Sequence, residues 1–207
     1  MIKLDRGARN AARREPVQEE CLNDPSSDAR LVEQVRTGQR EAFGVLVTRY
    51  EKKLERVLRR MVRDPEQARD LAQETFLRVY QHLDQFDASR RFGPWLFRVA
   101  MNLAVDWLRR RRPMIRLNQD SGPDRSGYEV VQPDPRPGVE LAQEVRYVLE
   151  QLPTHYRKVL ILRDLEGFSC SEVAAIEGRR EATIRWRLSI AREMFRKIWE
   201  GRQSKEP

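Results

Sequence analysis

The sequence has few cysteines, histidines and glycines, and each shortage excludes a class of protein. Only Cys21 and Cys170 occur among 207 residues, so there is no disulfide framework and no metal-ligand spacing. His82 and His155 stand without neighbouring ligands, and the sequence contains no glycine loop of the phosphate-binding type. It also has no paired-carboxylate metal motif and no histidine-based nucleophile set. We therefore expect no metal, no cofactor and no catalytic residue, and two distant thiols are typical of a reduced cytosolic protein.

Long apolar runs are absent as well. No run approaches the roughly 20 residues of a membrane-spanning helix, and the N-terminal residues lack the apolar core of a secretory signal. Positive charge is in excess, because the formal net charge is +8 and the isoelectric point about 9.9. Such an excess favours anionic partners such as nucleic acid or an acidic membrane surface. We expect a cytoplasmic protein without membrane insertion, in which residues 1–27 form a flexible basic arm.

The periodic parts of the chain consist mainly of arginine, leucine, glutamate, glutamine and alanine, which are good helix formers. Apolar residues recur at helical spacing over residues 28–112 and again over residues 139–202. Residues 113–138 hold clustered prolines and glycines without a sustained period, which is typical of a linker. The sequence thus predicts an all-α protein with two small helical domains, a flexible linker over residues 113–138 and a tail over residues 203–207.

One amphipathic helix in the first block ends in an unusual run of arginines. We expect this helix to begin at Pro94 and to end at Pro113, directly after the four arginines 109–112. Trp95 and Trp107 share an i, i+4 row with apolar neighbours, so we assign both to the core. One or two cations satisfy the negative end of a helix dipole. Four therefore indicate either a solvated helix end or a strongly anionic ligand.

The second block contains a helix-turn-helix pattern. Ala174, Gly178 and Ile184 supply a small residue where two helices approach, a glycine for the turn and an apolar residue that fixes the second helix. Cations crowd the second helix, and only Glu181 and Glu193 oppose them over residues 179–197. This charge favours a DNA-binding helix, whose first residues contact base edges while flanking cations contact phosphates. A solvated basic surface helix is the simpler alternative.

Two long stretches resemble one known family. The stretch "DPEQARDLAQETFLRVYQHLDQFDASRRFGPWLFRVAMNLAVDWLRRRR" is similar to the second conserved region of bacterial RNA polymerase sigma factors. The stretch "LEQLPTHYRKVLILRDLEGFSCSEVAAIEGRREATIRWRLSIAREMF" is similar to their fourth conserved region. A short chain with only a linker between the two blocks resembles the extracytoplasmic-function group of these factors. The likeness covers residues 28–112 and 139–200, in the order that the family has.

The resemblance implies a division of labour between the two blocks. The first would bind the coiled coil of the polymerase β′ subunit and would recognise and melt the minus-ten element of promoter DNA. The second would recognise the minus-thirty-five element, and the β flap would be a further contact with the core enzyme. The implied core-polymerase surface is Asp70, Gln73, Glu74 and Leu77. Without the resemblance, the polar members of this set would be an ordinary solvated helix face.

For the minus-ten element, the resemblance implies a loop, the helix behind it and the arginine-rich helix end. Capturing extruded bases in a pocket and stacking them on aromatic rings offsets the free energy that unstacking costs. The implied residues are Asp87, Ser89, Arg90, Arg91, Phe92, Asn102, Asp106, Arg109, Arg110, Arg111 and Arg112. The arginine run would then hold DNA phosphates.

For the minus-thirty-five element, the implied residues are Arg179, Arg180, Thr183, Arg185, Trp186, Arg187 and Ser189. The sequence departs from the family pattern at Glu177, where an apolar residue is common. It departs again at Ala182, where glycine is common, and at Trp186, where a small polar residue is common. The indole of Trp186 would pack on a sugar or a thymine methyl group, or it would cover a neighbouring helix.

The favoured interpretation is a sigma factor, a dissociable subunit that binds core RNA polymerase and directs promoter-specific transcription initiation. It would act in the cytoplasm, on the nucleoid, through polymerase. The alternative is a helix-turn-helix regulator that binds duplex DNA independently of polymerase. An enzyme acting on nucleic acid has little support because no catalytic motif is present. Many relatives are held inactive by an anti-sigma factor that clamps the two domains together, and the linker here would permit this.

Overall fold

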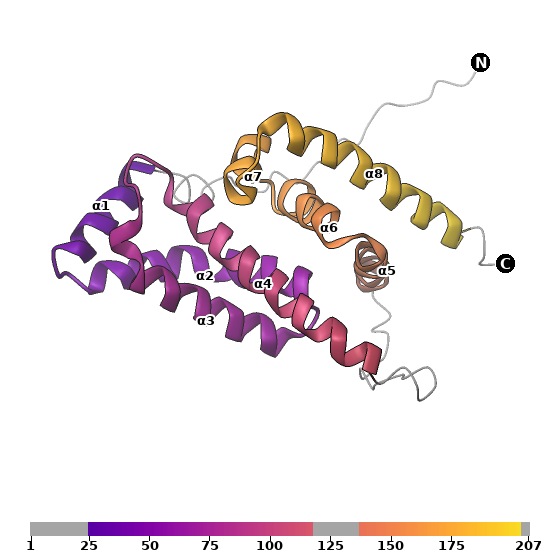
Figure 1. The fold of residues 1–207 in the computed structure, drawn as a ribbon, viewed down its shortest axis with the longest axis horizontal. Coiled ribbons are helices and arrows are strands. Elements are labelled where there is room, and N and C mark those ends of the chain that lie inside the picture. The colour runs from indigo at the N-terminus through magenta and orange to yellow at the C-terminus, as the bar shows by residue number, and fades with distance from the viewer. Residues whose placement is uncertain (1–24, 118–136, 204–207) are drawn as a thin grey trace, which may run out of the picture.

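Figure 1 shows the computed structural model, in which helices form two blocks. The structure describes residues 25–117 and 137–203, and these residues form helices and turns without a strand. The predicted all-α class is therefore confirmed for the described part of the chain. The first helix begins at Pro25, so residues 25–27 of the predicted arm are helical. Residues 1–24, most of the predicted linker and residues 204–207 lie outside the described residues.

The first block packs its helices around an apolar core. It consists of α1 (Pro25–Arg36), α2 (Glu41–Val62), α3 (Pro65–Gln81), the short 3-10 turn η2 (Leu83–Gln85) and α4 (Phe92–Leu117). The α2 helix buries Leu46, Leu54 and Leu58 completely, because apolar residues recur on one of its faces at helical spacing. The Asp64 side chain accepts hydrogen bonds from the backbone N–H groups of Glu66 and Gln67, so α3 begins at a well-formed cap.

The α4 helix is longer at both ends than the sequence predicts. It begins at Phe92, two residues before Pro94, and continues past Pro113 to Leu117. The first turn of a helix has unsatisfied N–H groups in any case, so Pro94 fits anywhere in that turn and does not fix the first residue. At Pro113 one backbone hydrogen bond is lost, but a proline bends a helix as readily as it ends one. The expected helix bounds were therefore wrong.

The second block contains the predicted helix-turn-helix. It consists of α5 (Pro137–Gln151), α6 (Thr154–Leu160), the wider π turn η3 (Ile161–Leu165), α7 (Cys170–Glu177) and α8 (Glu181–Gln203). Ser169 caps α7, and Gly178 ends it in the left-handed region with a φ of 62°. Ala174 and Ile184 are both buried where α7 and α8 meet. The three residues that predicted this motif thus have the predicted roles.

The two blocks pack directly against each other. In Figure 1, α5, α6 and α7 lie toward the first block and α8 is outermost. The α7 helix contacts α4, and the Phe168 ring of the second block packs edge-on against Phe97 of α4, with ring centroids 4.8 Å apart. The Lys53 ammonium group lies 4.1 Å from the centroid of the same Phe168 ring. The buried apolar residues of both blocks therefore form one continuous cluster.

A buried carboxylate also joins the blocks. The Glu166 side chain is 0% exposed and lies between two cations of α2. Nε of Arg56 donates to its Oε2 at 2.9 Å, and Nη1 of Arg60 forms an ion pair with Oε1 at 2.9 Å. Arg63 forms a further ion pair with Glu150 of α5. Removing one partner of a buried ion pair is costly, so Glu166 ties the packed arrangement to these arginines.

Candidate functional site

The predicted core-polymerase residues share one exposed face of α3. Asp70 and Gln73 are exposed, and the Leu77 side chain is 52% exposed. Glu74 is half-buried and accepts a hydrogen bond from Nε of Arg78 at 2.6 Å. Because the four residues are spaced at i, i+3, i+4 and i+7, they project to the same side of the helix. A leucine exposed beside carboxylates has the mixed character of a protein-binding surface.

The loop before α4 is held by its own hydrogen bonds. The carboxylate of Asp87 accepts from the backbone N–H of Ser89 at 3.0 Å and from the Ser89 hydroxyl at 2.6 Å. These two bonds lower the pKa of Asp87, and the nearby Arg90 guanidinium lowers it further. Arg90 and Arg91 are exposed, and Arg91 lies 3.4 Å from a carboxylate oxygen of Glu172 on α7. The loop thus presents cations on an ordered backbone.

Phe92 lies behind this loop and not on its surface. Its side chain is 1% exposed and packs among the rings of Tyr50, Phe86 and Trp95. The Tyr50 hydroxyl donates to the buried carboxylate of Asp28, and burial together with that bond raises the Tyr50 pKa. The ring of Phe92 therefore supports the loop through packing. Sequence reasoning did not identify this aromatic cluster or the buried Asp28.

The predicted DNA-contacting residues of α4 lie on its polar face. Asn102, Arg109 and Arg110 are exposed, and half-buried Asp106 accepts a hydrogen bond from Arg109 at 3.2 Å. The side chains of Arg111 and Arg112 lie outside the described residues. Trp95 and Trp107 are half-buried and pack against the core, as predicted from their spacing.

The turn of the helix-turn-helix approaches this polar face of α4. The guanidinium of Arg98 lies so close to Gly178 that a methyl group added there would be 3.2 Å from its Nη2. Arg98 is exposed and one helical turn before Asn102. In the packed arrangement the second block therefore contacts α4 next to the residues that the sequence assigns to the minus-ten element.

The predicted minus-thirty-five residues, which lie in the turn before α8 and on α8 itself, fall into two groups by exposure. Arg179, Arg180, Arg185, Trp186 and Ser189 are exposed, whereas Thr183 and Arg187 are half-buried. Arg185 forms an ion pair with Glu181 at 2.6 Å, and the hydrogen bond to that carboxylate raises the Arg185 pKa. Because 3.6 residues make one turn, Arg187 lies nearly opposite Ser189 on the helix. The helix therefore presents most, but not all, of the predicted residues to one side.

Glu177 explains where Arg187 points. The Glu177 side chain is 5% exposed and forms ion pairs with Nζ of Lys158 at 2.6 Å and with Nη1 of Arg187 at 3.5 Å. The three residues join α6, α7 and α8 at one buried point. The sequence marks Glu177 as unusual, because the family commonly has an apolar residue at this position. It did not predict that Glu177 would pair with Lys158 and Arg187.

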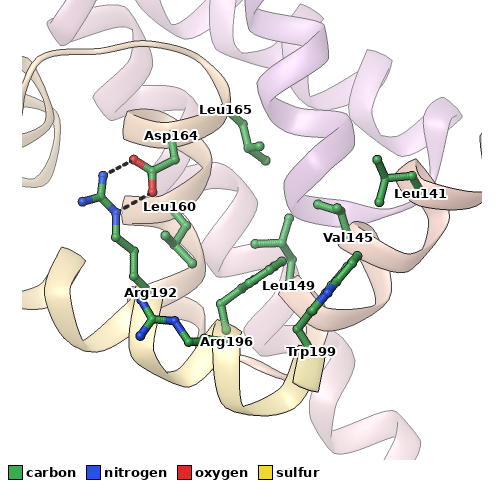
Figure 2. Close-up of a pocket in the computed structure, with 10 residues that line it drawn as sticks. Leu141, Val145, Leu149, Leu160, Asp164, Leu165, Arg192, Arg196 and Trp199 are labelled. Carbon is green, nitrogen blue, oxygen red and sulfur yellow. Dashed lines mark hydrogen bonds and ion pairs between the residues drawn. The ribbon is translucent and has the colours of Figure 1, made fainter. Parts of the chain in front are cut away.

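An apolar groove lies between α5, η3 and α8 (Figure 2). Its volume is about 560 Å³, and Leu141, Val145, Leu149 and Trp199 form its apolar wall. Leu141 is 54% exposed, so the groove opens to the surface. Arg192 and Arg196 line it from α8, and Arg192 is held by Asp164 at 2.6 Å. Sequence reasoning did not predict this groove, because it depends on how α5 packs against α8.

The described residues hold neither a metal-ion cluster nor a membrane-spanning helix. No three or more histidine, cysteine, aspartate or glutamate side chains among them gather as a metal ion would require. Within the same residues, no helix combines the length and apolarity needed to cross a membrane.

Together, the helix-turn-helix of the second block and the exposed cations of the first block are typical of a helical DNA-binding protein. Comparison with known proteins identifies the family. The family model for Sigma-70 region 2 matches residues 46–113, and the model for Sigma-70, region 4 matches residues 142–195. The chain is 30% identical to the ECF RNA polymerase sigma factor SigW of Bacillus subtilis, over 80% of this chain and 93% of that protein. It is 33% identical to the RNA polymerase sigma-H factor of Pseudomonas aeruginosa, over 82% of this chain and 92% of that one.

Solved structures show the same relationship. The structure of CnrH in complex with the cytosolic domain of CnrY matches with a TM-score of 0.66 and 30% identity, over 84% of this chain and 98% of CnrH. The sigma factor RpoE from Bartonella quintana, solved with the anti-sigma factor NepR, matches with a TM-score of 0.56 at 23% identity, over 76% of this chain and 96% of that one. The second likeness supports the fold alone.

The chain belongs to the extracytoplasmic-function group of RNA polymerase sigma factors. It is therefore a transcription initiation factor that directs polymerase to promoters. An independent helix-turn-helix regulator is not favoured, because the family match includes the first block as well as the second.

Proposed function

We propose that three separate surfaces divide the work of promoter recognition in this chain. The α3 face with Asp70, Gln73, Glu74 and Leu77 binds the coiled coil of the β′ subunit. The loop before α4 and the polar side of α4 bind the minus-ten element, and the outer face of α8 binds the minus-thirty-five element. The observation that carries this proposal is that all three faces are exposed within the two regions that match the family.

Melting is assigned to the loop and α4. Arg90, Arg91, Arg109 and Arg110 are exposed cations that can contact the phosphates of a separated strand. Ser89 and Asp87 keep the loop backbone in place while a base is extruded into it. Because phosphate contacts release counterions, promoter binding should weaken steeply as salt is raised.

Promoter binding requires the two blocks to separate. The minus-ten and minus-thirty-five elements are about 25 base pairs apart, or roughly 85 Å along B-form DNA at about 3.4 Å per base pair. In the packed arrangement α7 contacts α4, so α7 and α8 cannot lie on an element so far upstream of the one that α4 contacts. The packed form is the free protein, and core polymerase holds the blocks apart.

The apolar groove of the second block serves as the contact for the β flap of the core enzyme. Its exposed leucine and its indole, Leu141 and Trp199, offer the surface that an amphipathic helix needs. An anti-sigma factor that covers the same groove would compete with polymerase. RpoE, which shares this fold, has been solved with the anti-sigma factor NepR, and we propose that an anti-sigma factor controls this chain as well.

The chain needs no catalytic residue in this role, because core polymerase makes the RNA, and it acts in the cytoplasm on the nucleoid. Run-off transcription with core polymerase on genomic fragments tests the proposal. We expect RNA chains that start at defined positions only when the full chain is added. Gel-shift binding that is tight and sequence-specific without core polymerase would instead support an independent regulator.

A further inference from the structure

The base-reading part of α8 is apolar at its centre. Ala182, Trp186 and Ser189 are exposed and follow one another at i, i+4 and i+7, so they form one strip along the helix. All three lie within the first three turns of α8, which begins at Glu181. In a helix-turn-helix, residues near the N-terminus of the second helix contact base edges in the major groove.

Trp186 is the large side chain of this strip. It is 58% exposed, so it does not cover a neighbouring helix. An indole offers a large rigid apolar surface, and tryptophan is among the residues that contribute most to binding at interfaces. Ala182, one turn before it, adds a small apolar neighbour without blocking the approach of a base pair.

The cations near the strip lie to its sides or further along α8, so Trp186 occupies its centre. Arg187 faces the other side of α8 and is bound to the buried carboxylate of Glu177 at 3.5 Å. Arg185 is exposed but lies on the flank of the strip, where its guanidinium forms an ion pair with Glu181. Arg192 is held by Asp164 outside the first turns. Arg179 and Arg180 are exposed as well, but they precede the first residue of α8. Within the first turns of α8 itself, the centre of the exposed strip is therefore apolar.

In the major groove, the apolar group of a base pair is the 5-methyl of thymine, and small apolar and aromatic side chains contact it. We propose that the exposed strip of Ala182 and Trp186 reads a thymine methyl group in the minus-thirty-five element. This inference rests on the proposed function and specifies which base chemistry that surface selects.

The proposal is tested by removing the thymine methyl group from the DNA and the indole from the protein, singly and together. The probe is the promoter duplex identified by run-off transcription, with each thymine of its minus-thirty-five element replaced singly by deoxyuridine. Affinity is measured with holoenzyme at one fixed salt concentration, for the wild-type chain and for Trp186→Ala. Burial of a methyl group predicts that deoxyuridine at one position weakens wild-type binding about fourfold. The same replacement should leave the affinity of the Trp186→Ala holoenzyme unchanged.

Two controls accompany this experiment. Deoxyuridine in the spacer between the elements should have no effect, and Glu193→Gln, a change further along the same face, should respond to the methyl group as the wild type does. The proposed reading of the methyl group is overturned if no single deoxyuridine weakens wild-type binding. It is also overturned if the Trp186→Ala holoenzyme still binds the thymine duplex about fourfold more tightly than the deoxyuridine duplex. A holoenzyme that starts no RNA at a defined position would instead refute the proposed function itself.

Discussion

At the scale of single residues, two carboxylates decide what this chain can present to DNA. Glu177 is buried and draws Arg187 away from the outer face of α8, while Asp87 orders the loop before α4. The buried Glu177 is not expected to touch a base. Both act by fixing where a neighbouring cation or backbone segment lies, which is why substitutions at these positions give distinct results.

Glu177→Ala should destabilise the second block. The change leaves Lys158 and Arg187, whose side chains are 14% and 19% exposed, without their acidic partner. Unpaired buried charge costs several kcal/mol, and with this partial exposure we expect the free energy of unfolding to fall by about 2 kcal/mol. Urea unfolding measures the loss. The matched control is Glu193→Ala, which removes an exposed pair with Lys197 and should change stability by less than about 0.5 kcal/mol. Equal effects of the two variants would contradict this account.

Ser89→Ala should raise the pKa of Asp87 toward its ordinary value of 3.8, because the hydroxyl that donates to the carboxylate is the main cause of the lowered value. A carboxylate with a depressed pKa stabilises the folded loop above its ordinary pKa and loses that contribution as the pH falls through the depressed value. Carboxyl NMR titration of Asp87 in both chains measures the difference. An unchanged pKa would mean that Ser89 does not hold the loop.

At the scale of helices, the sequence predicts local features well. Ala174, Gly178 and Ile184 identify the helix-turn-helix because the motif depends on contacts between neighbouring segments. The bounds of α4 were wrong because a proline fits anywhere in the first turn of a helix and can also be accommodated inside one, so Pro94 and Pro113 do not fix its ends. Glu177 was noticed only as a departure from the family, since its partners lie on two other helices.

Asp70→Lys on α3 should weaken binding to core polymerase at least tenfold without unfolding the chain. The residue is exposed, so reversing its charge changes the surface and leaves the core intact. Co-purification with core enzyme measures binding, and circular dichroism reports the helix content. Glu51→Lys, a charge reversal at another exposed position, on α2, should bind core enzyme as the wild type does. Retained co-purification of Asp70→Lys would remove α3 from the polymerase interface.

At the scale of the whole molecule, the packing of the two blocks is the feature that the sequence did not predict. Helical periodicity says which face of a helix is buried but not which other domain covers it. Glu166 appears in the sequence as an ordinary acidic residue after a helix, and its partners are more than a hundred positions earlier in the chain. Its burial between Arg56 and Arg60 belongs to the tertiary structure alone.

Glu166→Lys should separate the blocks. The change places a third cation beside Arg56 and Arg60, where burial makes the repulsion strong. A compact chain of this length has a radius of gyration of about 17 Å, and we expect small-angle scattering to show an increase of several ångströms. The helix content should stay unchanged, and Glu51→Lys serves again as the control. A native radius of gyration in Glu166→Lys would show that the buried pair does not hold the blocks together.

The central claim is that this chain directs core polymerase to a promoter and opens its minus-ten element. Permanganate footprinting of the mapped promoter with core polymerase and the full chain tests it most directly. Permanganate oxidises unpaired thymines, so it reports whether the minus-ten region has been opened. We predict reactive thymines there with wild-type holoenzyme, and none with core enzyme alone or with core enzyme mixed with the Asp70→Lys chain. A promoter that stays unreactive while the wild-type chain is bound to core polymerase would contradict the claim.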